Sequence, residues 1–267
     1  MLAFISLLSC QERLPVPKVA ASDDAGIAWY QLLRKASHNQ DVDYALIKRQ
    51  RIVLDQYMVW LAHHGPRTEK YSIREEDRKI VFYANAYNAA VIYAVLQNEP
   101  IESVQDVHSG SFRYSNSGFF LGQLFLIDGE WMSLFHLEQD LFLSQFQDPR
   151  LHVMLNCASK GCPPVRYWTE QGLERQLDRA WTSYIENNVR KTESGWAVSE
   201  LFFWYEKDLI GWSDAETLCD YFQRYAKGNF LTWLQEDRSS CTLQSFSYDW
   251  SLNDASSSEP VSPQNGD

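Results

Sequence analysis

The sequence lacks every short motif that usually marks nucleotide-dependent or metal-dependent chemistry. It contains no P-loop, no G-x-G-x-x-G turn, no H-E-x-x-H helix and no G-x-S-x-G nucleophile elbow. Its few cysteines and histidines are also too scattered to supply four closely spaced zinc ligands. We therefore predict a protein that uses neither a metal ion nor another cofactor.

Basic charge and long apolar runs are also scarce. The chain has 24 Lys and Arg against 35 Asp and Glu, and the net charge of −11 argues against nucleic-acid binding because phosphate backbones are repelled. No uninterrupted run of 18 apolar residues occurs, so we do not expect the domain to span a membrane. Internal repeats and heptad patterns are missing as well.

Aromatic residues, in contrast, are plentiful. Ten Trp, 14 Tyr and 14 Phe give this chain of 267 residues enough apolar surface for a large core, which a disordered chain would not have. Helical and alternating patterns are mixed without regular β-α-β alternation, which is typical of an α+β fold. We expect one domain, residues 25–254, in which several helices pack on a small, mainly antiparallel sheet.

The first ten residues differ from the rest of the chain. Residues 1–9 are almost wholly apolar and lead to Cys10 in a run that resembles the lipobox of bacterial lipoproteins, although no Lys or Arg opens it. The pattern predicts export to the periplasm, with lipidation of Cys10 as the link to the membrane. The alternative is an apolar chain end that frays from the domain. We expect a tether over residues 11–24 and a disordered tail over residues 255–267.

Four cysteines remain after Cys10. Export would place them in an oxidising compartment, where Cys157, Cys162, Cys219 and Cys241 can pair in three ways. If Cys219 pairs with Cys241, that bridge would be structural, and the other two cysteines would be left for chemistry or for a local disulfide.

Hydrophobic periodicity and turn residues predict the order of the elements. We expect helices over 43–64, over 72–96 with a capping box at 72–75, from Ser133, from Thr169 and from Ser213 to Gly228, a hairpin over 119–132 with its turn at Asp128 and Gly129, and strands over 151–157, 196–199 and 242–250.

Residues 152–164 (HVMLNCASKGCPP) are the strongest candidate for chemistry. Cys157 ends a predicted strand and enters a turn, where backbone amides and Lys160 would favour its thiolate form. The alternatives are a structural thiol, a disulfide with Cys162, or a redox pair with Cys162. In an extended strand, His152 would lie about 16 Å from Cys157 on the opposite face, so we interpret it as a structural or ligand-binding histidine.

A thiolate nucleophile also needs a base that a third group orients. His136 is our candidate base, because polar residues interrupt an apolar run around it, and Glu138 is the candidate orienting acid. An amide such as that of Asn88 is an alternative to the acid. Such a Cys-His-acid site is defined by its geometry and not by the order of its residues along the chain.

Asn85 and Asn88 share one face of the predicted helix over 72–96. Because buried Asn side chains must be hydrogen-bonded, this pair either ties the helix to a neighbouring loop or lines a pocket. Together with Asn156, His152 and Cys162, they are our candidate binding residues.

Five segments, spread over residues 71–254, occur in a recognisable order and spacing. They are residues 82–89 (FYANAYNA), 148–152 (DPRLH), 156–164 (NCASKGCPP), 199–205 (SELFFWY) and 248–253 (YDWSLN). Together they resemble the family called domain of unknown function 547. That family is similar to papain-like or transglutaminase-like thiol enzymes, which implies a related fold. Family members often have His directly after the acid that matches Glu138, where this chain has Gln139; His136 lies three residues earlier and is the candidate replacement.

Two functions from different classes follow from these observations. The first is an envelope-located, thiol-dependent hydrolase or acyl-transfer enzyme that acts on a peptide or a peptide-like small thiol, with Cys157 as nucleophile, His136 as base and Glu138 as orienting acid. The alternative is a non-catalytic periplasmic binding or scaffold protein with a structural disulfide between Cys157 and Cys162.

Overall fold

The computed structural model describes residues 11–68, 76–109, 112, 116–236 and 241–257. About 52% of the chain is helical and 14% is in strands, arranged as a single domain, so the predicted α+β class is confirmed. The predicted export signal with Cys10, the capping box at 72–75 and the tail from residue 258 lie outside the described residues.

Helices make up most of the architecture. In chain order they are α1 (Ala25–Ala36), α2 (Tyr44–Arg49), α3 (Arg51–His63), α4 (Glu76–Asn98), the 3-10 helix η2 (Val104–Asp106), α5 (Ser117–Phe120), the π-helix η3 (His136–Leu143), the 3-10 helix η4 (Pro149–Met154), α6 (Leu173–Asn187), α7 (Glu200–Trp204), α8 (Glu206–Gly211), α9 (Leu218–Gln223), α10 (Gly228–Glu236) and the 3-10 helix η5 (Ala255–Ser257).

The strands form three small sheets within the described residues. The strands are β1 (Glu12–Arg13), β2 (Ser37–His38), β3 (Asp41–Val42), β4 (Gln123–Ile127), β5 (Glu130–Met132), β6 (Val189–Thr192), β7 (Gly195–Ser199) and β8 (Gln244–Phe246). Their order in the sheets is β1-β4-β5, β2-β3 and β6-β7-β8. The pairs β1–β4 and β7–β8 are parallel and the others are antiparallel, so the strands are divided among small sheets and do not form one platform.

Helix α4 is the centre of the core. From Tyr83 to Leu96 every residue is buried, which is why the helix shows little amphipathic character. By length and composition it is also the one described helix apolar enough to cross a membrane, and 78% of that stretch is buried inside the protein. The core helix of a soluble protein has the same properties.

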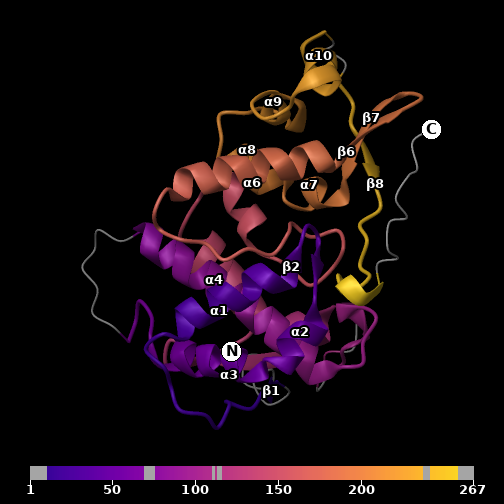
Figure 1. Ribbon diagram of the computed structural model, residues 1–267. Coiled ribbons are helices and arrows are strands. Elements are labelled where there is room, and N and C mark those ends of the chain that lie inside the picture. Colours follow the sequence, from indigo (N-terminus) through magenta and orange to yellow (C-terminus); the bar gives the residue numbers. More distant parts are fainter. Residues whose placement is uncertain (1–10, 69–75, 110–111, 113–115, 237–240, 258–267) are drawn as a thin grey trace, which may run out of the picture.

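The C-terminal segment joins the two halves of the molecule. In Figure 1 the indigo and magenta elements α1–α4 lie together in the lower part of the view, and the orange elements α6–α10 lie above them. The yellow chain after β8 returns from this second group to the first. Tyr44 of α2 donates a hydrogen bond from its hydroxyl to Asn253 at 2.7 Å, and Val42 pairs with Asp254. The chain between β8 and η5 therefore runs from one group of helices to the other and connects them.

The residues predicted to be a tether pack on the domain. Residues Glu12 and Arg13 form β1 beside β4, and Leu14 is buried at 6% exposure. The backbone carbonyl of Pro15 accepts a hydrogen bond from the Tyr93 hydroxyl at 2.7 Å. Strand pairing, the burial of Leu14 and this hydrogen bond thus hold the segment against the core.

Several predicted elements are confirmed, with changed ends. The hairpin of β4 and β5 turns at Asp128 and Gly129, both with positive φ, as predicted. The helix predicted over 43–64 is split into α2 and α3 at Gln50. The predicted helix starts at Thr169 and Ser213 were wrong. Gly172, with φ of 73°, precedes α6, and the Thr217 side chain caps α9 by accepting from the backbone of Asp220.

Candidate functional site

The loop that carries Cys157 begins where η4 ends. Asp148 caps η4 by accepting a hydrogen bond from the backbone N–H of Arg150, and Pro149 suits the first helical turn. The strand predicted over 151–157 was therefore wrong, because the Asp-Pro pair starts a helical turn just before the apolar run. In consequence, His152 and Cys157 do not lie on opposite faces of a strand. Both line one cavity.

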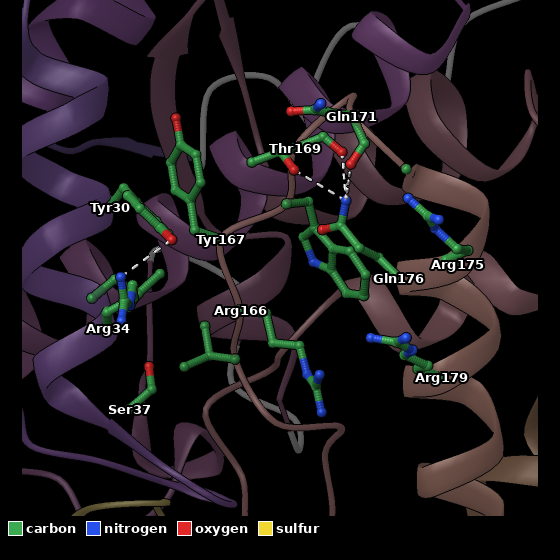
Figure 2. Close-up of a pocket in the computed structure, with 14 residues that line it drawn as sticks. Tyr30, Arg34, Ser37, Arg166, Tyr167, Thr169, Gln171, Arg175, Gln176 and Arg179 are labelled. Atoms are coloured by element: carbon green, nitrogen blue, oxygen red, sulfur yellow. Dashed lines mark hydrogen bonds between the residues drawn. The ribbon is translucent and has the colours of Figure 1, made fainter.

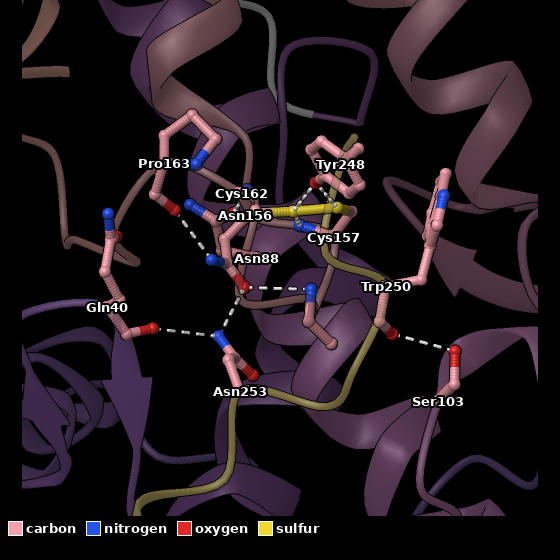
Figure 3. The surroundings of a disulfide bond; sticks show 12 residues. Gln40, Asn88, Ser103, Asn156, Cys157, Cys162, Pro163, Tyr248, Trp250 and Asn253 are labelled. Atoms are coloured by element: carbon pink, nitrogen blue, oxygen red, sulfur yellow. Dashed lines mark hydrogen bonds between the residues drawn. A yellow bond between two sulfur atoms is a disulfide. The ribbon is translucent and has the colours of Figure 1, made fainter. Parts of the chain in front are cut away.

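Asparagine side chains hold this loop in place. The Asn88 side chain donates to the carbonyl of Met154 at 2.8 Å and accepts from the backbone N–H of Asn156 at 2.9 Å. The Asn156 amide in turn donates to the carbonyl of Pro163 at 2.7 Å, which closes the turn between the two cysteines (Figure 3). Asn253, from the C-terminal segment, donates to Asn156 at 3.3 Å. These asparagines are buried and bond to the backbone and to one another.

Asn85 has the same role one turn earlier on α4. Its side chain donates to the carbonyl of Trp168 and accepts from the Trp168 backbone N–H, both at 2.9 Å. Of the two readings left open by the sequence, the structure thus shows Asn85 and Asn88 tying the helix to neighbouring loops. Neither lines the cavity that Cys157 reaches.

Cys157 and Cys162 are joined by a disulfide. Cys162 is buried at 2% exposure, whereas Cys157 is only partly buried and lines the cavity. The hydroxyl of Tyr248 lies 2.9 Å from each sulfur atom, and the backbone N–H of Cys157 donates to the Cys162 sulfur, also at 2.9 Å (Figure 3). Two hydrogen-bond donors therefore point at the Cys162 sulfur.

The other two cysteines form a second disulfide, Cys219–Cys241. It links α9 to the chain just before β8, outside the cavity. Of the three possible pairings, the structure thus shows the one in which Cys219–Cys241 is a structural bridge.

The cavity beside the first disulfide measures about 470 Å³. Its mouth is aromatic, with Phe135 and Trp204 about half exposed and Trp204 stacked on Trp250 at 5.7 Å. Glu138 is the acidic residue that lines the cavity. A pocket of this size with an apolar wall and a few polar groups has the character of a small-molecule site.

Tyrosine hydroxyls hold the Glu138 carboxylate. Tyr87 donates to one carboxylate oxygen at 3.0 Å, and Tyr205 donates to the other at 3.1 Å. Burial, followed by the charge of Glu138, raises the pKa of Tyr87 and Tyr205 well above the ordinary value of tyrosine. Both tyrosines therefore remain protonated donors, and they keep the carboxylate in a fixed position.

His152 is held between aromatic rings at the same cavity. Its Nε2 lies 3.1 Å from a carboxylate oxygen of Asp208. Its ring stacks on Trp212 at 5.9 Å and lies 3.9 Å from the centre of the Tyr205 ring. The Asp208 carboxylate fixes the orientation of the His152 ring. His152 therefore lies at the same cavity as Cys157, although the predicted strand would have placed the two residues on opposite faces.

The structure does not assemble the predicted triad of Cys157, His136 and Glu138. His136 begins the π-helix η3 on the outside, where its Nδ1 contacts Asp140 at 2.8 Å and 42% of the side chain is exposed. It is not a lining residue of the cavity. Gln139 does line the cavity and donates to Glu138 at 2.9 Å. The wide turn of the π-helix thus carries Glu138 and Gln139 inward and leaves His136 outside.

Residues 72–185 match the family model described as "Protein of unknown function, DUF547". Over these residues the chain is similar to the DUF547 family. The matched region includes all of α4, η3, η4 and the disulfide loop, so it supplies Tyr87, Glu138 and both sulfur atoms of the cavity. No curated protein and no solved structure matches the chain significantly.

Part of the cavity wall lies beyond the region that matches the DUF547 model. Trp204 and Tyr205 come from α7 and the residue after it, and Tyr248 and Trp250 come from the C-terminal segment. From the sequence, none of these four residues was assigned a role in the site. The signal that could have found them is the resemblance itself, because both segments belong to the recurring pattern.

Proposed function

We propose that this protein binds a small thiol, such as a short peptide that contains cysteine, and exchanges the Cys157–Cys162 disulfide with it. The observation that supports this proposal is the position of the disulfide in the wall of the aromatic cavity, with Cys157 on the open side and Cys162 behind it. A bonded Cys157 is not a free nucleophile, so the hydrolase reaction considered from the sequence would require prior reduction.

The exchange has two steps. The ligand thiolate attacks the Cys157 sulfur, the sulfur–sulfur bond breaks, and its electron pair goes to Cys162 as a thiolate. A second ligand thiolate then attacks the mixed disulfide and releases Cys157, so two thiols become one organic disulfide and the protein gains two protons and two electrons. An organic disulfide reverses the reaction and restores the oxidised protein.

The donors around Cys162 favour its departure. The Tyr248 hydroxyl and the backbone N–H of Cys157, each 2.9 Å from the Cys162 sulfur, would stabilise negative charge on that atom. Burial raises the pKa of Tyr248 well above its ordinary value, so its hydroxyl keeps the proton that it donates. Both hydrogen-bond donors are therefore already in place when the Cys162 sulfur becomes the leaving group.

The cavity also suggests which thiols fit. The aromatic rim of Phe135, Trp204 and Trp250 offers apolar contact to a side chain, and Glu138 offers a carboxylate to a ligand amine. Tyr87, Tyr205 and Gln139 use part of the capacity of that carboxylate, which accepts about four hydrogen bonds. An aminothiol with an apolar neighbour, as in a peptide with cysteine at its amino end, matches these groups.

Alkylation mass spectrometry tests the exchange. The oxidised protein is treated with a Cys-Phe dipeptide near pH 7.5 and then trapped with iodoacetamide. We expect Cys157 in a mixed disulfide and Cys162 alkylated, while Cys219–Cys241 stays intact and serves as the internal control. Tyr248→Phe should slow the reaction at Cys157 by about tenfold or more, because a hydrogen bond to a charged sulfur is lost.

If Cys157 and Cys162 react only after denaturation, the bridge is structural and the exchange proposal fails. The protein would then be a binding protein with a closed disulfide, the alternative already considered from the sequence.

We also propose that the protein is exported and anchored through lipidated Cys10, because the apolar residues 1–9 end at that cysteine. Expression of the wild type and of Cys10→Ala in bacteria, followed by membrane fractionation, tests this. The wild type should sediment with membranes and the variant should be soluble. Equal distribution of the two proteins would reject the anchor.

A further inference from the structure

A second cavity, of about 660 Å³, lies away from the disulfide. It is bounded by α1, by residues 165–172 and by the first turns of α6 (Figure 2). Four arginines line it, Arg34, Arg166, Arg175 and Arg179, and no Asp or Glu is among its lining residues. Such a concentration of one sign is unexpected in a chain whose net charge is −11.

Carboxylates in the neighbourhood do not neutralise these arginines. Within the described part of the chain, none of the four makes an ion pair. Glu174 and Asp178 alternate with Arg175 and Arg179 along α6 but contact Arg150, at 2.8 and 2.7 Å. Arg175 and Arg179 are four residues apart on one helix face, where like charges repel. The protein thus maintains an arrangement of charge that is unfavourable without an anion.

Other groups in the cavity are also ready for a ligand. The Ser37 hydroxyl oxygen is buried and has no hydrogen-bond partner among the described residues, although the residue lines the cavity. Arg166 reaches solvent, yet the surrounding protein partly dehydrates its guanidinium and lowers its pKa. A bound anion would supply an acceptor to both groups.

We propose that this cavity binds a small phosphorylated molecule through its four arginines. Guanidinium groups match phosphate oxygens in a two-pronged geometry, and arginines from three separate parts of the chain can surround more than one phosphate. The rings of Tyr30 and Tyr167, with centroids 5.2 Å apart, form one side of the cavity. Arg34 lies over the Tyr30 ring, so the Tyr167 ring is the one that offers apolar contact to the organic part of the ligand. Whether it is a substrate or an effector, this ligand carries at least two negative charges.

Calorimetric titration of the full chain with pyrophosphate tests the proposal. Binding should be saturable at low ionic strength and weaken with added salt. Arg175→Gln and Arg179→Gln should each weaken it by about tenfold or more, and the double variant by more than either one. Arg49→Gln is the matched control, because Arg49 is an exposed arginine on α2 outside the cavity, and its affinity should stay within about twofold of the wild type.

Two further titrants separate phosphate recognition from general attraction of charge. Glycerol phosphate should bind measurably, and citrate, which carries comparable charge on carboxylates, should bind more weakly than pyrophosphate. The proposal is overturned by an absence of saturable pyrophosphate binding, by equal affinity for citrate, or by an equal effect of Arg49→Gln. Folding of the variants is checked by their circular dichroism, and the exposed position of the two arginines predicts wild-type spectra.

Discussion

A few residues define the environment of the disulfide, either through a side-chain amide group or through their small size. Asn88 and Asn156 set the path of the backbone on both sides of Cys157. Tyr248 reaches both sulfur atoms only because its ring lies directly over Gly161. The absence of a side chain at residue 161 is thus a condition for the hydrogen bonds at the sulfur atoms.

Gly161→Ala should lower the free energy of unfolding by about 1–3 kcal/mol, the usual cost of overpacking. A methyl group there would lie 2.7–2.9 Å from ring atoms of Tyr248, so the ring has to move. Urea unfolding followed by fluorescence measures the effect. Gly211→Ala is the control, because nothing lies within 4 Å of its added methyl group, and it should leave stability unchanged or raise it slightly. Equal effects of the two changes would contradict the close packing.

At the scale of elements, the site depends on two short helices that differ from ordinary α-helix. η4 replaces a predicted strand, and η3 is a π-helix where the sequence indicated only a helical start. A π-helix has a wider turn, and such turns occur often at functional sites. Here η3 presents Glu138 and Gln139 to the cavity and His136 to solvent. Residue spacing calculated for an α-helix or a strand therefore assigned the wrong neighbours.

On the scale of the whole molecule, the cavity closes only when distant parts of the chain meet. η3 and η4 supply one side, α7 supplies another, and the segment after β8 supplies Tyr248 and Trp250. The buried tyrosine hydroxyls at this junction are Tyr87, Tyr205 and Tyr248, and burial raises the pKa of each well above its ordinary value. Such groups link the stability of the fold to pH.

We expect stability to fall as the pH rises above about 10. The unfolded chain releases tyrosine protons near pH 10, whereas the folded protein keeps them, so each buried tyrosine costs up to about 1.4 kcal/mol per pH unit above that value. Below pH 10 this contribution is fully present. Urea unfolding between pH 8 and 11 measures it, with tyrosinate absorbance of the urea-denatured protein as the control. If native and denatured tyrosines ionise at the same pH, the buried network does not exist.

The sequence alone determined the composition-dependent features of this protein. Its aromatic content, its α+β class and the hairpin at Asp128 and Gly129 all follow from local patterns, because turns and burial depend on neighbouring residues. The resemblance carried by five separate segments predicted similarity to the DUF547 family, and the family match over residues 72–185, which contains three of them, supports it.

Only the tertiary structure decided which chemistry-bearing groups meet. The partner of Cys157, the choice of His152 over His136 at the cavity, and the convergence of four arginines on a second cavity depend on contacts between residues far apart in the chain. Such contacts arise from the packing of whole elements, and a change from strand to helical turn at η4 is enough to alter them. Local sequence patterns carry no measure of these distances, which is the physical reason that the site had to be read from the fold.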